Sequence, residues 1–154
     1  MIYVTVGFSE YPFTRLIKVM DSICHGLNDK VIMQIGTTAY VPENCKFIHK
    51  VDEELQTKHM REARVIVAHA GAGTILTARE LGKPMIIMPR RHDLGEHVDD
   101  HQLELCEELA KLDWIRIVHN KEELESAIRN HRVKPKHKDG GKIIAQDIIH
   151  FLKK

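Results

Sequence analysis

The segment 65–89 constrains the fold more than any other part of the sequence, because its pattern predicts a strand, a glycine turn, a helix and a second strand. The runs 65–68 and 85–88 are apolar without a break, as expected for strands buried on both faces of a parallel sheet. Between them we expect a short helix at 74–81, preceded by the turn 69–74 with its two glycines. Glycine lets another group approach the backbone, and the free N–H groups of a helix N-terminus favour anions. The turn therefore predicts an anion site suited to phosphate.

The rest of the chain alternates in the same way between apolar runs and amphipathic segments. We expect strands at 2–6, 31–35, 46–49, 65–68, 85–88 and 114–118. We expect helices at 14–28, 53–62, 74–81, 100–111, 122–130 and 142–152. This alternation predicts the α/β class, as a Rossmann-like, doubly wound parallel sheet whose ligands bind beyond the carboxyl ends of the strands.

The 154 residues suffice for one domain with its own core, so we expect a single domain over 1–154. The segment 129–142 is rich in Lys and Arg and contains a proline and two glycines, which predicts an exposed basic loop before the C-terminal helix. The loop lacks interleaved aromatic residues, and the formal net charge of the chain is only +1. Neither feature points to a nucleic-acid partner.

The cysteines Cys24, Cys45 and Cys106 are odd in number and lack a Cys-x-x-Cys spacing. They predict buried free thiols in a reducing, cytoplasmic setting, without a disulfide or a zinc knuckle. The sequence opens directly on an expected strand, so we expect no signal peptide. No apolar run approaches the ~20 residues that a membrane-spanning helix needs.

The turn 69–74 does not match two well-known phosphate-binding motifs. The third glycine of a dinucleotide-binding fingerprint is replaced by Leu76, and the Gly-Lys-Ser/Thr of a P-loop is absent. What remains is a compact phosphate cradle in which His69 and Thr74 can donate hydrogen bonds. The alternative is an ordinary strand-to-helix turn whose glycines serve only the backbone geometry.

The segment 90–102 is rich in histidine and acidic residues and allows three interpretations. His97 and His101 are four residues apart, and with His92 and nearby carboxylates they could serve a metal-dependent hydrolase. The same side chains could instead recognise sugar hydroxyls, since they offer several hydrogen-bonding atoms. The third interpretation is a solvated helix start with acidic residues near the positive end of the helix.

Five motifs together carry a family resemblance, which thins after about Trp114. They are His69-Ala-Gly-Ala-Gly-Thr74, Glu80-Leu-Gly-Lys-Pro84, Met88-Pro-Arg-Arg91, Gly95-Glu-His97 and Asp100-His-Gln102. This combination resembles the C-terminal half of family 28 glycosyltransferases, and more closely the free-standing donor-binding subunits of two-part enzymes. Such subunits occur in the N-acetylglucosaminyltransferase that extends dolichol-linked precursors and in bacterial exopolysaccharide synthesis.

The resemblance implies one half of a GT-B fold that binds a UDP-sugar, UDP-N-acetylglucosamine or a related donor. It also implies an inverting hexosyl transfer without a metal or other cofactor, because a helix N-terminus can stabilise the charge that develops on UDP. The acceptor and the catalytic base would come from a membrane-anchored partner subunit that holds a lipid-linked acceptor. We therefore expect a cytoplasmic chain that is recruited to the membrane face and is inactive alone. A non-catalytic UDP-binding module remains the other possibility.

The same likeness assigns residues to each part of the donor. The diphosphate would contact Gly7, Phe8, His69, Gly71, Ala72, Gly73 and Thr74. The ribose and uracil would lie near Gln34, Gly36, His49, Val51 and Thr77. The sugar would contact Glu96, His97, Asp100, His101 and Gln102. Many relatives carry a glutamate for the ribose hydroxyls where this chain has Thr77, a departure that favours the exopolysaccharide branch.

Overall fold

The computed structural model describes residues 1–130 and 149–150. Most of the predicted basic loop and of the predicted helix at 142–152 lies outside these described residues. The first two residues of that loop, Arg129 and Asn130, belong instead to the last helix of the sheet domain. Within the described ranges, no helix is long and apolar enough to cross a membrane.

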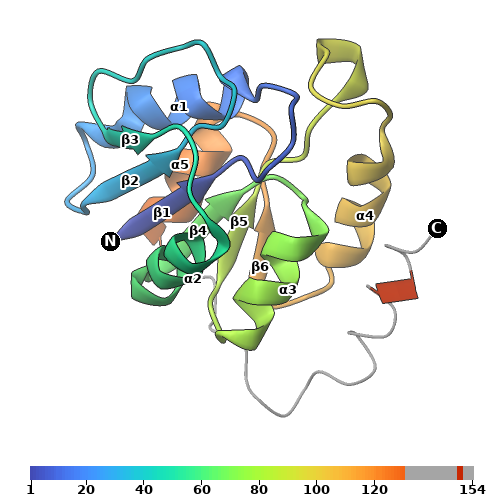
Figure 1. Ribbon diagram of the computed structural model, residues 1–154. Coiled ribbons are helices and arrows are strands. Elements are labelled where there is room, and N and C mark those ends of the chain that lie inside the picture. The colour runs from blue at the N-terminus through green and yellow to red at the C-terminus, as the bar shows by residue number, and fades with distance from the viewer. Residues whose placement is uncertain (131–148, 151–154) are drawn as a thin grey trace.

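In the described part of the chain, six parallel strands form one sheet in the order β3-β2-β1-β4-β5-β6, which Figure 1 shows edge to edge. The strands are β1 (Ile2–Thr5), β2 (Val31–Gln34), β3 (Lys46–Ile48), β4 (Val65–Ala68), β5 (Met85–Ile87) and β6 (Ile115–Ile117). All six predicted strands are confirmed, and so is the doubly wound order. Because β1 and β4 are neighbours, the chain reverses its direction of winding between them. That reversal is where such sheets bind ligands.

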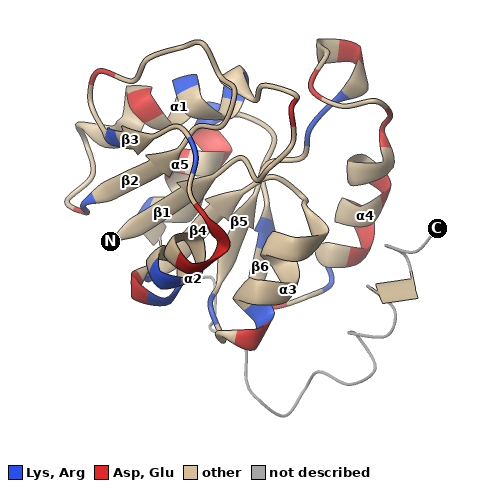
Figure 2. Cartoon of the chain, in the orientation of Figure 1, with Lys and Arg blue, Asp and Glu red and all other residues tan. Residues whose placement is uncertain are grey.

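Within residues 1–130, five α-helices and one 3-10 turn connect and cover the strands. They are α1 (Thr14–Cys24), α2 (Glu53–Glu62), α3 (Ala72–Glu80), η1 (His92–Leu94), α4 (His101–Leu109) and α5 (Lys121–Asn130). Apolar side chains of α1 and α5 pack on one face of the sheet. Those of α2, α3 and α4 pack on the other face. Figure 2 shows the charged residues mainly on helices and loops, as a sheet covered on both faces requires.

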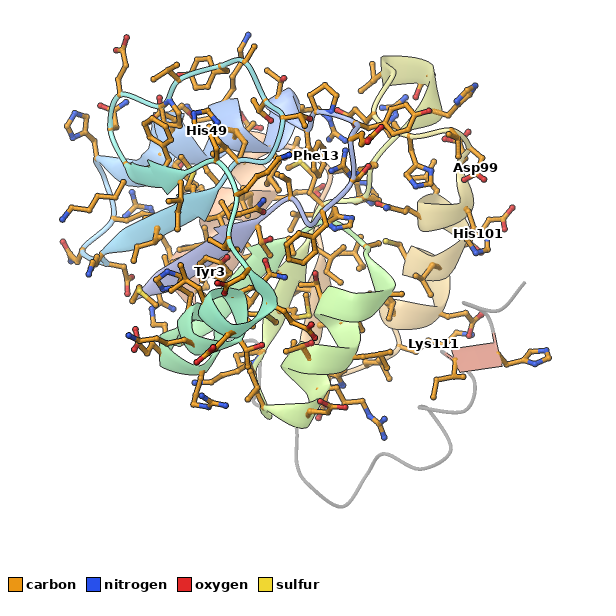
Figure 3. The ribbon with its side chains drawn as sticks, in the orientation of Figure 1. Tyr3, Phe13, His49, Asp99, His101 and Lys111 are labelled. Carbon is orange, nitrogen blue, oxygen red and sulfur yellow. A yellow bond between two sulfur atoms is a disulfide. The ribbon has the colours of Figure 1, made fainter. Side chains whose placement is uncertain are left out.

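The strand side chains alternate between the two layers. Val4 lies in the layer under α1 and α5, whereas its neighbour Tyr3 lies in the layer under α2. The Tyr3 ring stacks on His59 of α2 with a centroid distance of 5.2 Å, and Figure 3 shows Tyr3 beside that helix. Burial raises the pKa of Tyr3 well above its ordinary value. The Tyr3 hydroxyl therefore stays protonated and donates a long hydrogen bond of 3.5 Å to Gln56.

The prediction that all three cysteines are free thiols is wrong. Cys24 at the end of α1 and Cys45 just before β3 form a disulfide, with their Cα atoms 6.2 Å apart. Cys106 of α4 is buried and free. The sequence separation of the bonded pair is 21 residues. Only the packing of α1 beside the β2–β3 loop brings these cysteines together, so their spacing could not reveal the bond.

A buried arginine connects the loops after β1 and β5. The guanidinium of Arg90 donates to the carbonyl oxygens of Val6 (2.8 Å), Tyr11 (2.8 Å), Pro12 (3.4 Å) and Glu96 (3.0 Å). Its Nε atom has no partner among the described residues. Burial lowers the pKa of Arg90 to about 10, so the group is still charged at neutral pH. The charge is thus held by backbone dipoles and lies over a ring, with Cζ 4.9 Å from the centroid of Phe13.

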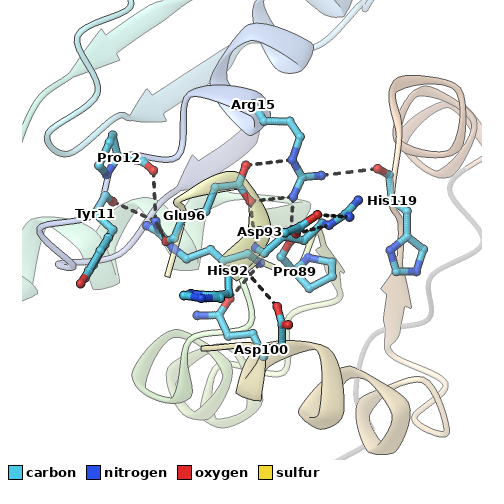
Figure 4. Close-up of polar contacts among 12 residues, drawn as sticks. Tyr11, Pro12, Arg15, Pro89, His92, Asp93, Glu96, Asp100 and His119 are labelled. Carbon is cyan, nitrogen blue, oxygen red and sulfur yellow. Dashed lines mark hydrogen bonds and ion pairs between the residues drawn. The ribbon is translucent and has the colours of Figure 1, made fainter. Parts of the chain in front are cut away.

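An ion pair at the rim strengthens the same connection. Arg15 of α1 donates to both carboxylate oxygens of Glu96, each at 2.9 Å, and to the carbonyl of Pro89 at 2.8 Å (Figure 4). The bidentate pairing fixes the direction of the Glu96 carboxylate. The loop after β5 is therefore attached to both α1 and the loop after β1.

Replacing Arg90 tests this connection. We expect Arg90→Leu to lower the free energy of unfolding by about 3 kcal/mol, because four buried carbonyl groups lose their donor. The measurement is urea denaturation followed by circular dichroism. Arg91→Leu is the matched control, since Arg91 is exposed and its side chain pairs with exposed Asp93. Equal stability of the two variants would contradict a structural role for Arg90.

Candidate functional site

A cavity of about 420 Å³ lies at the carboxyl edge of the sheet, where the winding reverses. Its walls come from the loop after β1, the first turns of α2, the turn after β4 and the start of α3. The lining residues are Gly7, Phe8, Glu53, Gln56, Thr57, His69, Gly71, Ala72, Gly73, Thr74 and Thr77. The size is within the range of small-molecule sites. All seven residues predicted for the diphosphate are among them, together with Thr77 from the predicted ribose set.

The N-terminus of α3 opens into this cavity. The helix begins at Ala72, two residues earlier than predicted, so Gly73 and Thr74 lie in its first turn. Gly71 is the N-cap residue, and no side chain caps the helix. Its first N–H groups therefore have no partner from a helix turn or a cap, and the positive end of the helix dipole faces the same space. This end of the cavity is suited to an anion.

Two glycines make room for the His69 ring. A Cβ atom added at Gly7 or at Gly71 would collide with the His69 imidazole. Gly7 also has φ +73°, a left-handed conformation that side chains disfavour. A Cβ atom at Gly73, by contrast, would meet nothing within 4 Å. Gly7 and Gly71 thus serve the protein's own packing, whereas Gly73 leaves space inside the cavity.

A chain of hydrogen bonds orients the His69 ring. The Arg90 backbone N–H donates to Gln102 Oε1 at 3.1 Å, which fixes the amide of Gln102. Gln102 Nε2 then lies 3.2 Å from His69 Nδ1 and acts as the donor to it. His69 Nδ1 is consequently the acceptor, so the neutral ring carries its proton on Nε2. His69 Nε2 is the ring atom nearest to the position of a Cβ at Gly7, and both residues line the cavity.

The His69 imidazole is neutral at physiological pH. Burial and, to a smaller extent, the positive charge of Arg90 and the neighbouring His97 lower the pKa of His69 to about 3. The hydrogen bond that Nδ1 accepts from Gln102 also favours the neutral ring. A neutral imidazole gives the cavity a fixed N–H donor that does not titrate near neutral pH.

The residues predicted for the ribose and uracil are divided between the cavity and the region behind it. Gln34 is almost fully buried, accepts from Thr5 Oγ1 at 2.8 Å and donates to the Gly7 carbonyl at 3.1 Å. It also donates to the carbonyl of His49, at 3.3 Å. Gln34 thereby holds the loop after β1 against the end of β3. Gly36, His49 and Val51 follow β2 and β3 and are not part of the cavity lining.

The residues predicted for the sugar lie at the start of α4 and in the loop before it. His97, Asp100 and His101 are near the protein surface, and none of them lines the cavity. Figure 3 places His101 on the opposite side of the view from His49. Glu96 and Gln102 are nearly buried and already engaged, with Arg15 and with His69 respectively. In this structure these two side chains hold neighbouring residues in place and do not line the cavity.

The histidines of the segment 90–102 do not form a metal cluster. Among the described residues, no three His, Cys, Asp or Glu side chains are grouped so that they could hold a metal ion. His92 Nδ1 lies 3.1 Å from the His97 carbonyl, and His97 Nδ1 lies 3.2 Å from Asp99. These contacts stay within the loop, so the geometry does not favour the metal-dependent hydrolase.

Three lining residues were not predicted from the sequence: Glu53, Gln56 and Thr57 of α2. A usable indication was present, because the helix expected at 53–62 follows directly on an expected strand. Its first turns must then lie at the same edge of the sheet as the turn 69–74. The face of the sheet that α2 covers, however, depends on the strand order, which the sequence does not give.

The neutral state of His69 predicts a specific pH dependence of stability. In the unfolded chain the imidazole has its ordinary pKa near 6.5, whereas the folded protein excludes the proton until about pH 3. The contribution of neutral His69 to the free energy of unfolding is therefore complete above the unfolded pKa. It falls as the pH is lowered from 7 to 4, by at most about 1.4 kcal/mol per pH unit. We expect His69→Gln to remove that part of the slope in urea denaturation at several pH values. Parallel slopes for both proteins would contradict a buried neutral His69.

The protein-family comparison matches residues 1–146 to the glycosyltransferase family 28 C-terminal domain. Among curated relatives, the human UDP-N-acetylglucosamine transferase subunit ALG13 is 28% identical over 121 residues, covering 71% of this chain and 10% of that protein. The Candida albicans subunit of the same name is 31% identical over 74 residues, covering 48% of this chain and 24% of that protein. The chain thus spans less than a quarter of the length of these relatives. They do not test the preference for the exopolysaccharide branch, which stays a prediction.

Solved structures share the fold. The solution structure of ALG13 has a TM-score of 0.68 at 16% identity, covering 99% of this chain and 96% of that chain. Acinetobacter baumannii MurG has a TM-score of 0.62 at 19% identity, covering 99% of this chain but 49% of that one. The calicheamicin glycosyltransferase CalG4 has a TM-score of 0.59 at 14% identity, covering 97% of this chain and 39% of that one. One half of a GT-B fold is thereby confirmed. With residues 1–146 matched, the chain belongs to the family 28 glycosyltransferase C-terminal domains.

Proposed function

We propose that this chain is the donor-binding subunit of a two-component glycosyltransferase, and that its cavity binds the nucleotide of UDP-N-acetylglucosamine or a related UDP-sugar. One observation carries the proposal: a glycine-lined helix N-terminus and a neutral histidine donor meet in one cavity at the switch point of the sheet. The ALG13 relatives are named UDP-N-acetylglucosamine transferase subunits, which supports the choice of donor.

The cavity would act mainly on the diphosphate. The backbone N–H groups at the start of α3 and the Nε2–H of His69 would donate to its oxygens. Breaking the anomeric bond leaves additional negative charge on UDP, and these fixed donors would stabilise that charge where it develops. We propose that a helix N-terminus with these donors performs this task without a metal ion, in an inverting transfer.

The residues at the start of α4 would contact the transferred sugar. His97, Asp100 and His101 carry polar groups near the surface beyond the cavity. Glu96 and Gln102 would act indirectly, Glu96 by fixing the loop through Arg15 and Gln102 by orienting His69. The sugar would then lie at the outer edge of the site, accessible to an acceptor.

A partner subunit would supply the acceptor and the catalytic base. MurG and CalG4 each contain about as much chain again, or more, beyond the part that this domain covers. The loops after β1 and β5 expose the apolar side chains of Phe8, Tyr11, Leu94 and Val98, at 41% to 62% of their surface. We propose that a membrane-anchored subunit with a lipid-linked acceptor covers this side and brings the chain to the cytoplasmic membrane face.

Gly73 offers a test of the donor site. A Cβ atom at Gly73 would meet nothing within 4 Å, so Gly73→Leu adds a side chain in the cavity, and leucine is a better helix former than glycine. We expect unchanged or higher thermal stability and a loss of UDP affinity of more than about tenfold, because a displaced diphosphate loses several hydrogen bonds. Calorimetric titration with UDP and UDP-N-acetylglucosamine, with and without EDTA, measures this. Glu80→Leu is the control, since Glu80 is exposed on the same helix outside the cavity.

Three outcomes would count against the proposal. Absence of UDP binding by the wild-type chain would overturn the donor site. Binding that disappears with EDTA would overturn the metal-independent mechanism. Sugar transfer to a lipid acceptor by the purified chain alone would overturn the need for a partner.

A further inference from the structure

The two ends of the cavity differ in chemistry. The α3 end offers backbone N–H groups and the His69 donor, whereas the α2 end offers the side chains of Glu53, Gln56 and Thr57. Glu53 is the one carboxylate among the residues that line the cavity. Figure 2 shows acidic residues in red at the start of α2. The α2 end is therefore an acceptor of hydrogen bonds, opposite in character to the anion site.

Two contacts hold the start of α2 in place. The N-cap residue Asp52 accepts from the Leu55 N–H at 2.7 Å, which fixes the first turn. The Tyr3 hydroxyl donates to Gln56 Oε1 at 3.5 Å, and Thr5 Oγ1 lies 3.2 Å from the same oxygen, so α2 is held against β1. Glu53 lies in that first turn, between these two contacts. Its carboxylate is thus presented by a fixed helix end.

A carboxylate repels phosphate, so the α2 end must take an uncharged part of the ligand that donates hydrogen bonds. In a nucleoside diphosphate, the group attached directly to the phosphates is the ribose. Its 2′ and 3′ hydroxyls are adjacent donors, and an ionised carboxylate has two acceptor oxygens to receive them. A diphosphate at the α3 end would bring this diol into the same cavity.

We propose that Glu53 recognises the vicinal hydroxyls of the donor's ribose, a role that rests on the proposed function of the cavity. Glu53 thereby selects a ribonucleotide donor, while the α3 end binds any diphosphate. Thr57, one helical turn further along the same wall, adds a hydroxyl beside it.

The test compares Glu53→Ala with Glu54→Ala. Both acidic residues are in the first turn of α2, but only Glu53 lines the cavity. The two changes remove the same charge and the same helix-dipole interaction, so Glu54→Ala controls for both. Calorimetric titrations of the full chain use UDP and 2′,3′-dideoxy-UDP. A hydrogen bond to a charged group is worth about tenfold in affinity.

The expected result is a loss of UDP affinity of about tenfold for Glu53→Ala and little change for Glu54→Ala. Wild type should bind the dideoxy compound about tenfold more weakly than UDP, whereas Glu53→Ala should bind both ligands equally. Three results would overturn the inference alone: unchanged UDP affinity of Glu53→Ala, an equal loss in Glu54→Ala, or an equal loss for both ligands, which would indicate a contact to the base. Failure of the wild type to bind UDP would instead overturn the proposed function, and this inference with it.

Discussion

The buried guanidinium of Arg90 is the interaction on which the carboxyl edge of the sheet depends. Burying a charge away from water is costly unless its N–H groups find acceptors. Here two nitrogens of the guanidinium donate to four backbone carbonyl oxygens. Those carbonyls belong to the loops after β1 and β5, which a shorter or neutral side chain could not connect. The Arg90 backbone N–H adds the bond that fixes Gln102. One residue therefore both joins two loops and starts the chain that orients His69.

The geometry around His69 explains how a small cavity can be tightly packed on one side and still have open space on the other. The ring occupies the space that side chains at Gly7 and Gly71 would need, so these glycines are required by the protein itself. The remaining glycine, Gly73, leaves space for a ligand. Burial keeps the imidazole neutral, and the hydrogen bond from Gln102 places its proton on Nε2. A donor of this kind needs no reorganisation when an anion arrives.

The sequence predicted most residues of the cavity lining because a strand–turn–helix unit is encoded locally. The turn 69–74 contains two glycines and leads into the uncapped start of α3, and the strand patterns indicated which edge of the sheet it occupies. The roles of Gln34, Glu96 and Gln102 were beyond such reasoning, since polar side chains look alike whether they meet a ligand or a buried partner. The same holds for Glu53, whose place in the cavity depends on how α2 returns from β3 to β4.

The sequence alone thus determined the six strands, the helices that cover them and the glycine turn at the start of α3. Periodic burial and backbone preferences act over a few residues, so they can be recognised as a local pattern of apolar and polar residues in the sequence. Tertiary structure decided the Cys24–Cys45 disulfide, the burial of Arg90 and which polar residues line the cavity rather than pair inside the protein. These depend on contacts between residues far apart in the chain, such as Val6 and Arg90, which are 84 positions apart. No local pattern encodes which distant groups will meet.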